Sequence, residues 1–146
     1  MTARPELEFF NGLSGRLVIE LSEPPLQVAP GLLNVKAAPT ARITGLRLEV
    51  AVIEGERDRD VTQEELASVA FAAPRLALRG DTGEVVAHDA PNGSHFTVLD
   101  LIRAIEETER QTRGGSDWLG GVDIQHVYFE GLFEEEDGTW SIGWGS

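Results

Sequence analysis

One stretch of the chain has helical periodicity, and it limits how the rest can pack. Apolar residues recur there at the i, i+3, i+4 and i+7 positions, namely Val98, Leu101, Ile102 and Ile105. Thr97 with Asp100 three residues later is typical of a helix start, and Gly114–Gly115 is typical of a helix end. We therefore predict a helix over about residues 97–113 that packs on the core through one face.

Most of the other patterns are those of β-strands. Residues 43–53 alternate apolar and polar side chains over a long stretch, and residues 16–21 show the same two-residue period. Thr62 and Glu65 form a capping box, which predicts a short helix near residues 62–69. That helix must end before Pro74, because proline disfavours the α conformation of the residue before it.

Two pairs of apolar runs predict hairpins. The first pair flanks the Gly80–Gly83 turn, and the second, Val122–Phe133 with Thr139–Trp144, flanks an Asp-Gly turn. In the first strand of the second pair, Val122–Phe133, alternation divides the side chains between two faces. One face carries Ile124, His126, Tyr128 and Leu132, and the other carries Val127, Phe129 and Phe133. Because both faces are partly apolar, this strand is either central or has a face that meets a partner.

Together these elements predict an α+β fold. We expect a mostly antiparallel sheet, with the amphipathic helix over about residues 97–113 packed on one face and the short helix near residues 62–69. No internal repeat or linker divides the 146 residues, so we expect a single domain, 1–146. We also expect a cytoplasmic protein, because the sequence shows neither a signal peptide nor an apolar run of membrane-spanning length.

The charge of the chain is unevenly distributed. The formal net charge is −13, and residues 81–146 hold 14 acids against 3 bases, whereas residues 1–80 hold 11 acids against 9 bases. No lysine or arginine follows Arg113, although six of the ten aromatic residues do. This balance argues against nucleic acid and against an anionic membrane as partners.

An acidic segment rich in aromatic side chains is suited to binding a basic protein. We therefore predict a non-catalytic protein-binding domain, of the kind found in acidic inhibitor or immunity proteins, that engages its basic partner through the C-terminal half. The predicted binding residues are Trp118, Phe129, Phe133, Glu134, Glu135, Glu136, Asp137 and Trp144.

Two alternatives remain open. The first is a small metal-dependent or hydrolytic enzyme that uses His88, His95 and His126, because imidazoles serve as general bases and metal ligands. Their spacing fits no metal-ligand pattern, so we predict no catalytic residue, no metal and no cofactor. The second alternative is a structural subunit of a larger assembly, with possible homo-oligomer contacts through strand edges or the aromatic face.

The C-terminal half also resembles a fungal domain family of unknown function. The matching segments are TVLDLIRAI (Thr97–Ile105), LGG (Leu119–Gly121), FEGL (Phe129–Leu132) and DGTW (Asp137–Trp140). The matched motifs are structural in character. The resemblance implies one α+β unit, and it implies no activity and no catalytic residue, because the family has none assigned.

Overall fold

The computed structural model describes residues 4–22, 26–27, 35–36, 42–115 and 122–146, and a seven-stranded sheet dominates it. In spatial order the strands are β5 (Arg57–Arg59), β4 (Ile43–Glu54), β1 (Ser14–Leu21), β10 (Tyr128–Glu134), β11 (Trp140–Gly145), β7 (Arg75–Arg79) and β8 (Val85–Asp89). All neighbours are antiparallel except β11 and β7, which are parallel. The predicted α+β class and mostly antiparallel sheet are therefore confirmed.

Smaller elements surround this sheet. The described helices are α1 (Glu8–Asn11), α2 (Gln63–Leu66) and α3 (Val98–Thr112), with 3-10 turns at Pro5–Leu7 and Arg113–Gly115. Two further strand pairs are β2 (Leu26–Gln27) with β3 (Val35–Lys36), and β6 (Val69–Phe71) with β9 (Phe96–Thr97). None of the helices in the described ranges has the length and apolar character needed to cross a membrane.

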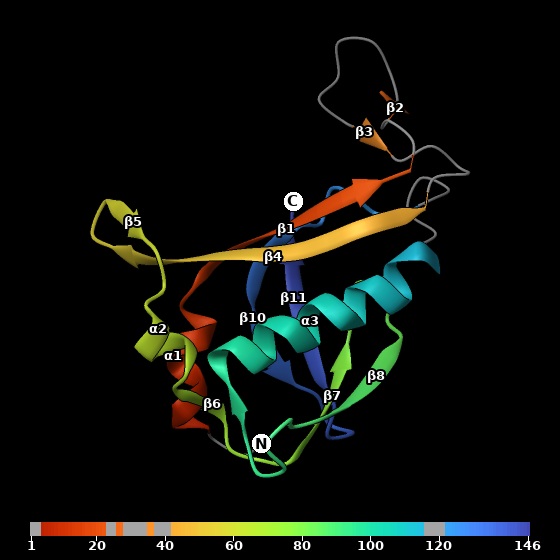
Figure 1. The fold of residues 1–146 in the computed structure, drawn as a ribbon. Coiled ribbons are helices and arrows are strands. Elements are labelled where there is room, and N and C mark those ends of the chain that lie inside the picture. The colour runs from red at the N-terminus through yellow and green to blue at the C-terminus, as the bar shows by residue number, and fades with distance from the viewer. Residues whose placement is uncertain (1–3, 23–25, 28–34, 37–41, 116–121) are drawn as a thin grey trace.

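Helix α3 lies across one face of the sheet (Figure 1). Its start is a complete capping box, in which the Thr97 side chain accepts from the backbone of Asp100 and the Asp100 carboxylate accepts from the backbone of Thr97. The predicted apolar stripe is confirmed, because Val98, Leu101, Ile102 and Ile105 are all buried. The same capping geometry at Thr62 and Glu65 opens α2, which is shorter than predicted.

The helix also satisfies part of the edge of β4. Strand β5 pairs only with the last residues of β4, Val52–Glu54, and among the described residues no strand pairs with the earlier part on that side. There the Glu106 carboxylate accepts from the backbone N–H of Leu48 at 2.8 Å, and an Arg110 nitrogen donates to the carbonyl of Leu46 at 3.4 Å. Side chains of α3 thus take hydrogen bonds that a neighbouring strand would otherwise make.

A β-bulge in β10 overturns the predicted assignment of its faces. The pairing of β10 with β11 shifts register between Phe129 and Gly131, and Gly131 has a φ of 113°. On either side of the bulge the burial pattern changes phase, so Phe129 and Leu132 are buried whereas Tyr128 and Phe133 are exposed. The strand is also shorter than predicted, because it begins at Tyr128 and residues 122–127 lie outside it.

The bulge requires glycine, since few side chains tolerate a φ of 113°. We predict that Gly131→Ala lowers the free energy of unfolding by about 1–3 kcal/mol. Gly114→Ala is the matched control, because an added Cβ there would meet no atom within 4 Å and its φ is not positive. Urea unfolding of both variants tests this expectation, and equal midpoints for the two would show that Gly131 carries no strain.

Candidate functional site

The predicted binding aromatics separate into buried and exposed groups. Phe129 is only 6% exposed and Trp144 packs against it, with ring centroids 6.2 Å apart, so both belong to the inner side of the sheet and not to a docking surface. Phe133 is 52% exposed, so its ring is accessible to a partner. Trp118 lies outside the described residues. Tyr128, which the prediction omitted, is 50% exposed.

Phe133 lies on the outer face of the sheet, above a floor of glycines. A Cβ on Gly143 would come within 2.7 Å of the Phe133 ring, and one on Gly131 would come within 3.4 Å of it. The neighbouring Gly145 is covered in the same way by the Glu130 carboxylate, at 2.6 Å from such a Cβ. The absence of side chains on these glycines lets Phe133 and Glu130 lie close to the backbone of β11.

The predicted acidic residues are at the turn between β10 and β11. Glu135, Glu136 and Asp137 are exposed, and Glu134 is half-buried. Asp137 has a structural role, because it accepts from Thr139 and pairs with Arg79 at 3.0 Å, and the hydrogen bonds from Thr139 are the main cause of its lowered pKa. Glu135 accepts from the Ser141 hydroxyl at 2.7 Å, which holds its carboxylate on the strand that carries the glycine floor.

The three histidines do not form one site. His88 bonds the Thr108 hydroxyl at 2.7 Å, and burial lowers its pKa. His95 lies in a turn with Ser94 and Asn92. His126 instead bonds the carboxylate of Asp123, with 2.7 Å between Nδ1 and Oδ2. The three-histidine enzyme is therefore not what the geometry supports.

The structure brings His126 together with two carboxylates that the prediction did not select. Asp81, in the turn after β7, and Asp123, in the segment before β10, each place a carboxylate oxygen within 4.8 Å of the other and of a His126 ring nitrogen. Asp123 is almost wholly buried, and its second oxygen accepts from the backbone N–H groups of Gln125 and His126. Two oxygens and a nitrogen at this spacing are the donors that a divalent metal ion uses.

A buried ion pair holds the two segments that carry this cluster. Arg113 and Glu109 are both 0% exposed, and the guanidinium Nε donates to Glu109 at 2.7 Å. Its Nη1 donates to the carbonyls of Asp123 and His126, at 2.9 and 2.8 Å, which fixes the segment that carries both residues. The other oxygen of Glu109 accepts from the backbone of Asp81 at 3.2 Å. One ion pair thus connects α3 to both segments of the cluster.

Arg113 also stacks over the indole of Trp144, at 5.2 Å from the ring centroid. Two buried donors in this contact, Arg113 Nη2 and Trp144 Nε1, have no hydrogen-bond partner in the described part of the chain. Such donors are rare in folded proteins, since burying them without an acceptor is costly. Both donors lie where the Arg113 side chain meets Trp144.

Close approach of the carboxylates perturbs their ionisation. Burial and the hydrogen bond with Asp123 raise the pKa of Asp81 to about 7, against the lowering effect of Arg113. The pKa of Asp123 is lowered despite its burial, because Asp81, Gln125 and His126 all hydrogen-bond its carboxylate. The pair therefore shares a proton at mildly acidic pH, which is the usual behaviour of two adjacent carboxylates.

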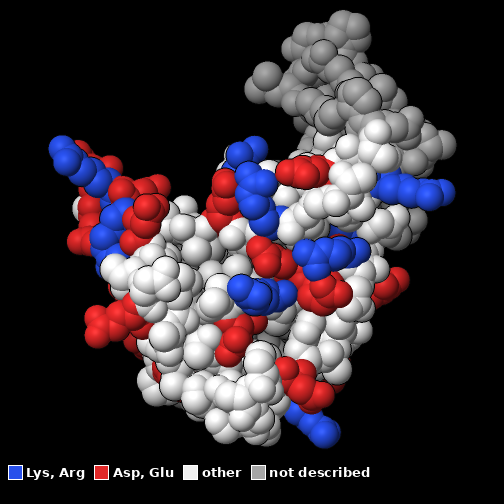
Figure 2. Space-filling model, viewed as in Figure 1, with Lys and Arg blue, Asp and Glu red and all other residues white. Residues whose placement is uncertain are grey.

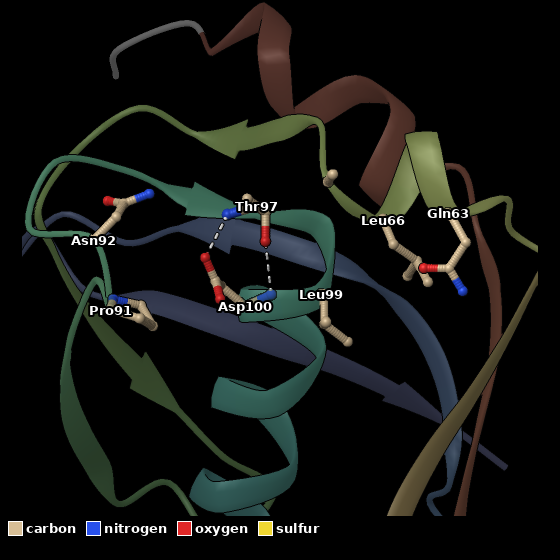
Figure 3. A pocket seen from close by; sticks show the side chains of 8 residues that line it. Gln63, Leu66, Pro91, Asn92, Thr97, Leu99 and Asp100 are labelled. Atoms are coloured by element: carbon tan, nitrogen blue, oxygen red, sulfur yellow. Dashed lines mark hydrogen bonds between the residues drawn. The ribbon is translucent and has the colours of Figure 1, made fainter.

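A shallow groove of about 450 Å³ lies elsewhere, between α2 and the start of α3 (Figure 3). Its walls include Leu66, Leu99 and Pro91. The polar groups of Thr97 and Asp100 are turned to one another in the capping box, as the dashed lines in Figure 3 show. Because these groups already serve the helix start, we assign the groove no binding function.

Sequence reasoning missed the cluster, although one signal for it was present. The stripe of α3 continues through Thr108, Glu109 and Thr112, all of which are buried. A glutamate at a core position with an arginine four residues later is a recognisable pattern for a buried ion pair. Nothing in the local pattern links Asp81 to Asp123, because they come from separate parts of the chain.

The buried pair should be essential to stability. We predict that Arg113→Met lowers the free energy of unfolding by about 3–5 kcal/mol, because Glu109 is left as an uncompensated buried charge. The double variant Arg113→Met with Glu109→Gln should lose less unfolding free energy than the sum of the losses in the two single variants. Urea unfolding of the four proteins measures this, with Arg103→Met as the control, because Arg103 is exposed on the same helix. Equal losses for Arg113→Met and Arg103→Met would contradict the expectation.

Asp81 should give the protein a distinctive pH dependence. Its pKa is about 7 when folded and close to 3.8 when unfolded, so its contribution to stability is complete below about pH 4 and is lost as the pH rises towards 7. The partial exposure of Asp81 reduces the size of this effect. We predict that Asp81→Asn gains stability relative to the parent protein between about pH 5 and 8, since asparagine donates to Asp123 without needing a proton.

The measurement is urea unfolding of both proteins at about pH 5 and at about pH 8, in the presence of EDTA. His88 contributes with the opposite sign, because its pKa is lowered, but it does so in both proteins and cancels in the comparison. The lowered pKa of Asp123 acts only at lower pH. A constant difference between Asp81→Asn and the parent protein across this range would be inconsistent with a raised pKa of Asp81.

Comparisons of the chain with protein-family models, with curated proteins and with solved structures found no match. The resemblance of the C-terminal half to a fungal domain family therefore stays a prediction.

Proposed function

We propose that this chain is a non-catalytic protein-binding domain that engages a basic partner through the outer face of β10 and β11 and the turn between them. The observation that carries the proposal is the pair of outward aromatic side chains, Tyr128 and Phe133, each about half exposed on the same central strand. Large exposed aromatic residues are the commonest anchors of protein interfaces.

The surroundings of Phe133 are also compatible with contact to a partner protein. The glycines of β11 let the Phe133 ring and the Glu130 side chain lie against the backbone of the strand, and Ser141 precedes Gly143 and Gly145 on this face. Helix α3 packs on the opposite face of the sheet.

The charge around Phe133 favours a basic partner. Glu130 and Glu135 lie on the strand face next to Phe133, and Glu136 extends from the turn. On the α3 side, by contrast, acidic and basic side chains are interspersed (Figure 2). The local excess of carboxylates at the β10–β11 turn would speed the encounter with a partner rich in lysine and arginine.

The first experiment identifies what contacts this face. A photo-crosslinking amino acid at position 133 is compared with one at position 53, because Ile53 is similarly exposed, at 56%, but lies at the far end of β4. We expect position 133 to capture a basic protein from the native source that position 53 does not. Capture of a neutral or acidic protein, or of a second copy of this chain, at position 133 would contradict the proposed partner.

The second experiment tests charge with the captured partner in purified form. We predict that changing Glu134, Glu135 and Glu136 to lysine weakens binding by at least about ten-fold and reduces its dependence on salt. The matched control changes Glu56, Asp58 and Glu64 to lysine, which alters the net charge equally on exposed residues of the β4–β5 hairpin and α2. Equal affinity in both triple variants would show that overall charge, and not this face, governs binding.

A further inference from the structure

We propose that Asp81, Asp123 and His126 form a binding site for a divalent transition-metal ion. The site is separate from the proposed docking face, because its three ligands lie at the C-terminal end of α3 and not around Phe133. It therefore stands or falls independently of the protein-binding function.

The three side chains offer a mixed set of oxygen and nitrogen ligands. One oxygen from each aspartate and one ring nitrogen from His126 lie within 4.8 Å of one another, and they come from two segments separated by α3 in the sequence. Carboxylate oxygens alone suit Mg²⁺ or Ca²⁺, whereas an imidazole nitrogen shifts the preference towards Zn²⁺, Mn²⁺ and other first-row ions. Three protein ligands leave positions for water, as in metal sites that exchange a ligand.

The charge balance gives a second reason. Arg113 is the cation that acts on Asp81, yet it is already paired with the buried Glu109. Asp81 and Asp123 are in contact with each other, and Asp123 also pairs with the His126 ring at 2.7 Å. A divalent metal ion between the two carboxylates would bring positive charge to a place where Arg113 is already engaged with Glu109.

The ligands are also held in place before any ion arrives. Asp123 is 2% exposed and accepts from two backbone N–H groups, and Arg113 holds the carbonyls of Asp123 and His126. The His126 side chain is 31% exposed, which gives an ion a route from solvent. Support of this kind behind the ligands is what sets metal affinity in proteins.

An independent observation comes from Arg113 itself. Its side chain is wholly buried, and its Nη2 has no hydrogen-bond partner in the described part of the chain. Nη2 shares one carbon atom with Nη1, which bonds the Asp123 and His126 carbonyls, so it lies next to the segment that carries two of the ligands. A donor left over at this position matches a site that is completed by an oxygen-bearing group, such as metal-bound water.

The experiment uses the full chain after treatment with EDTA and dialysis. Zn²⁺ and Mn²⁺ are titrated separately by calorimetry, and thermal unfolding is followed with and without each ion. We expect one Zn²⁺ per chain, a higher Tm with the ion bound, and weaker binding of Mn²⁺. Mg²⁺ is the third probe, and tighter binding of Mg²⁺ than of Zn²⁺ would show that the imidazole is not a ligand and would overturn the proposal.

Two variants and two controls locate the site. Asp81→Asn and His126→Gln should each weaken Zn²⁺ binding by at least about ten-fold, whereas Asp89→Asn and His95→Gln should leave it unchanged. Asp89 is an exposed aspartate on β8, and His95 lies in a turn away from the cluster. Circular dichroism of the metal-free variants confirms that each is folded. Unchanged affinity in Asp81→Asn or in His126→Gln, or the absence of stoichiometric binding by the parent protein, would overturn the proposal.

Discussion

The ion pair between Arg113 and Glu109 holds the structure together at the place where three segments meet. Both side chains are wholly buried, and each also hydrogen-bonds the backbone of a second segment. The guanidinium binds the segment before β10, and the carboxylate binds the turn after β7. An apolar substitute of the same volume could fill this space, but it could not fix the positions of two backbone segments at once. The pair therefore specifies geometry, and the cluster of Asp81, Asp123 and His126 depends on that geometry.

Close packing against this pair explains a glycine in the turn after β7. A Cβ on Gly80 would lie 2.4 Å from a carboxylate oxygen of Glu109 and 3.0 Å from the Thr112 hydroxyl. The turn can approach α3 only because residue 80 has no side chain. The same principle operates on the other side of the sheet, where glycines of β10 and β11 accept the Phe133 ring. Glycine thus determines how closely the chain approaches itself at both candidate sites.

The sequence was sufficient for the elements whose signal is local. The stripe and capping box of α3, the alternation of β4 and the turns of two hairpins all depend on residues a few positions apart, and all are present. The faces of β10 could not be predicted, because a single bulge at Gly131 reverses the alternation of buried and exposed side chains. A Glu-Gly-Leu sequence is not by itself a signal for a bulge. Phe129 was consequently expected on the surface, whereas it is in the core.

The cluster of Asp81, Asp123 and His126 was not predicted, for a different reason. Its members are joined by tertiary contacts between residues separated by α3, and hydrophobic periodicity carries no information about such contacts. The histidines attracted attention as a residue type, yet only His126 has a carboxylate partner close enough to act with it. Glu109 was the one local clue, because it occupies a core position in the helix pattern.

The acidic excess of residues 81–146 therefore does not act as one surface field. Glu109 and Asp123 are buried, Asp81 shares their environment, and Asp100 is committed to the capping box. Carboxylates withdrawn from solvent in this way contribute little to the potential that a distant partner meets, and they act instead on the groups that touch them. Around Phe133 and the β10–β11 turn, by contrast, Glu130, Glu135 and Glu136 remain exposed. The acidic residues of this half of the chain thus include a group buried near Arg113 and a group exposed at the β10–β11 turn, and the second group is the one available to the basic partner that we propose.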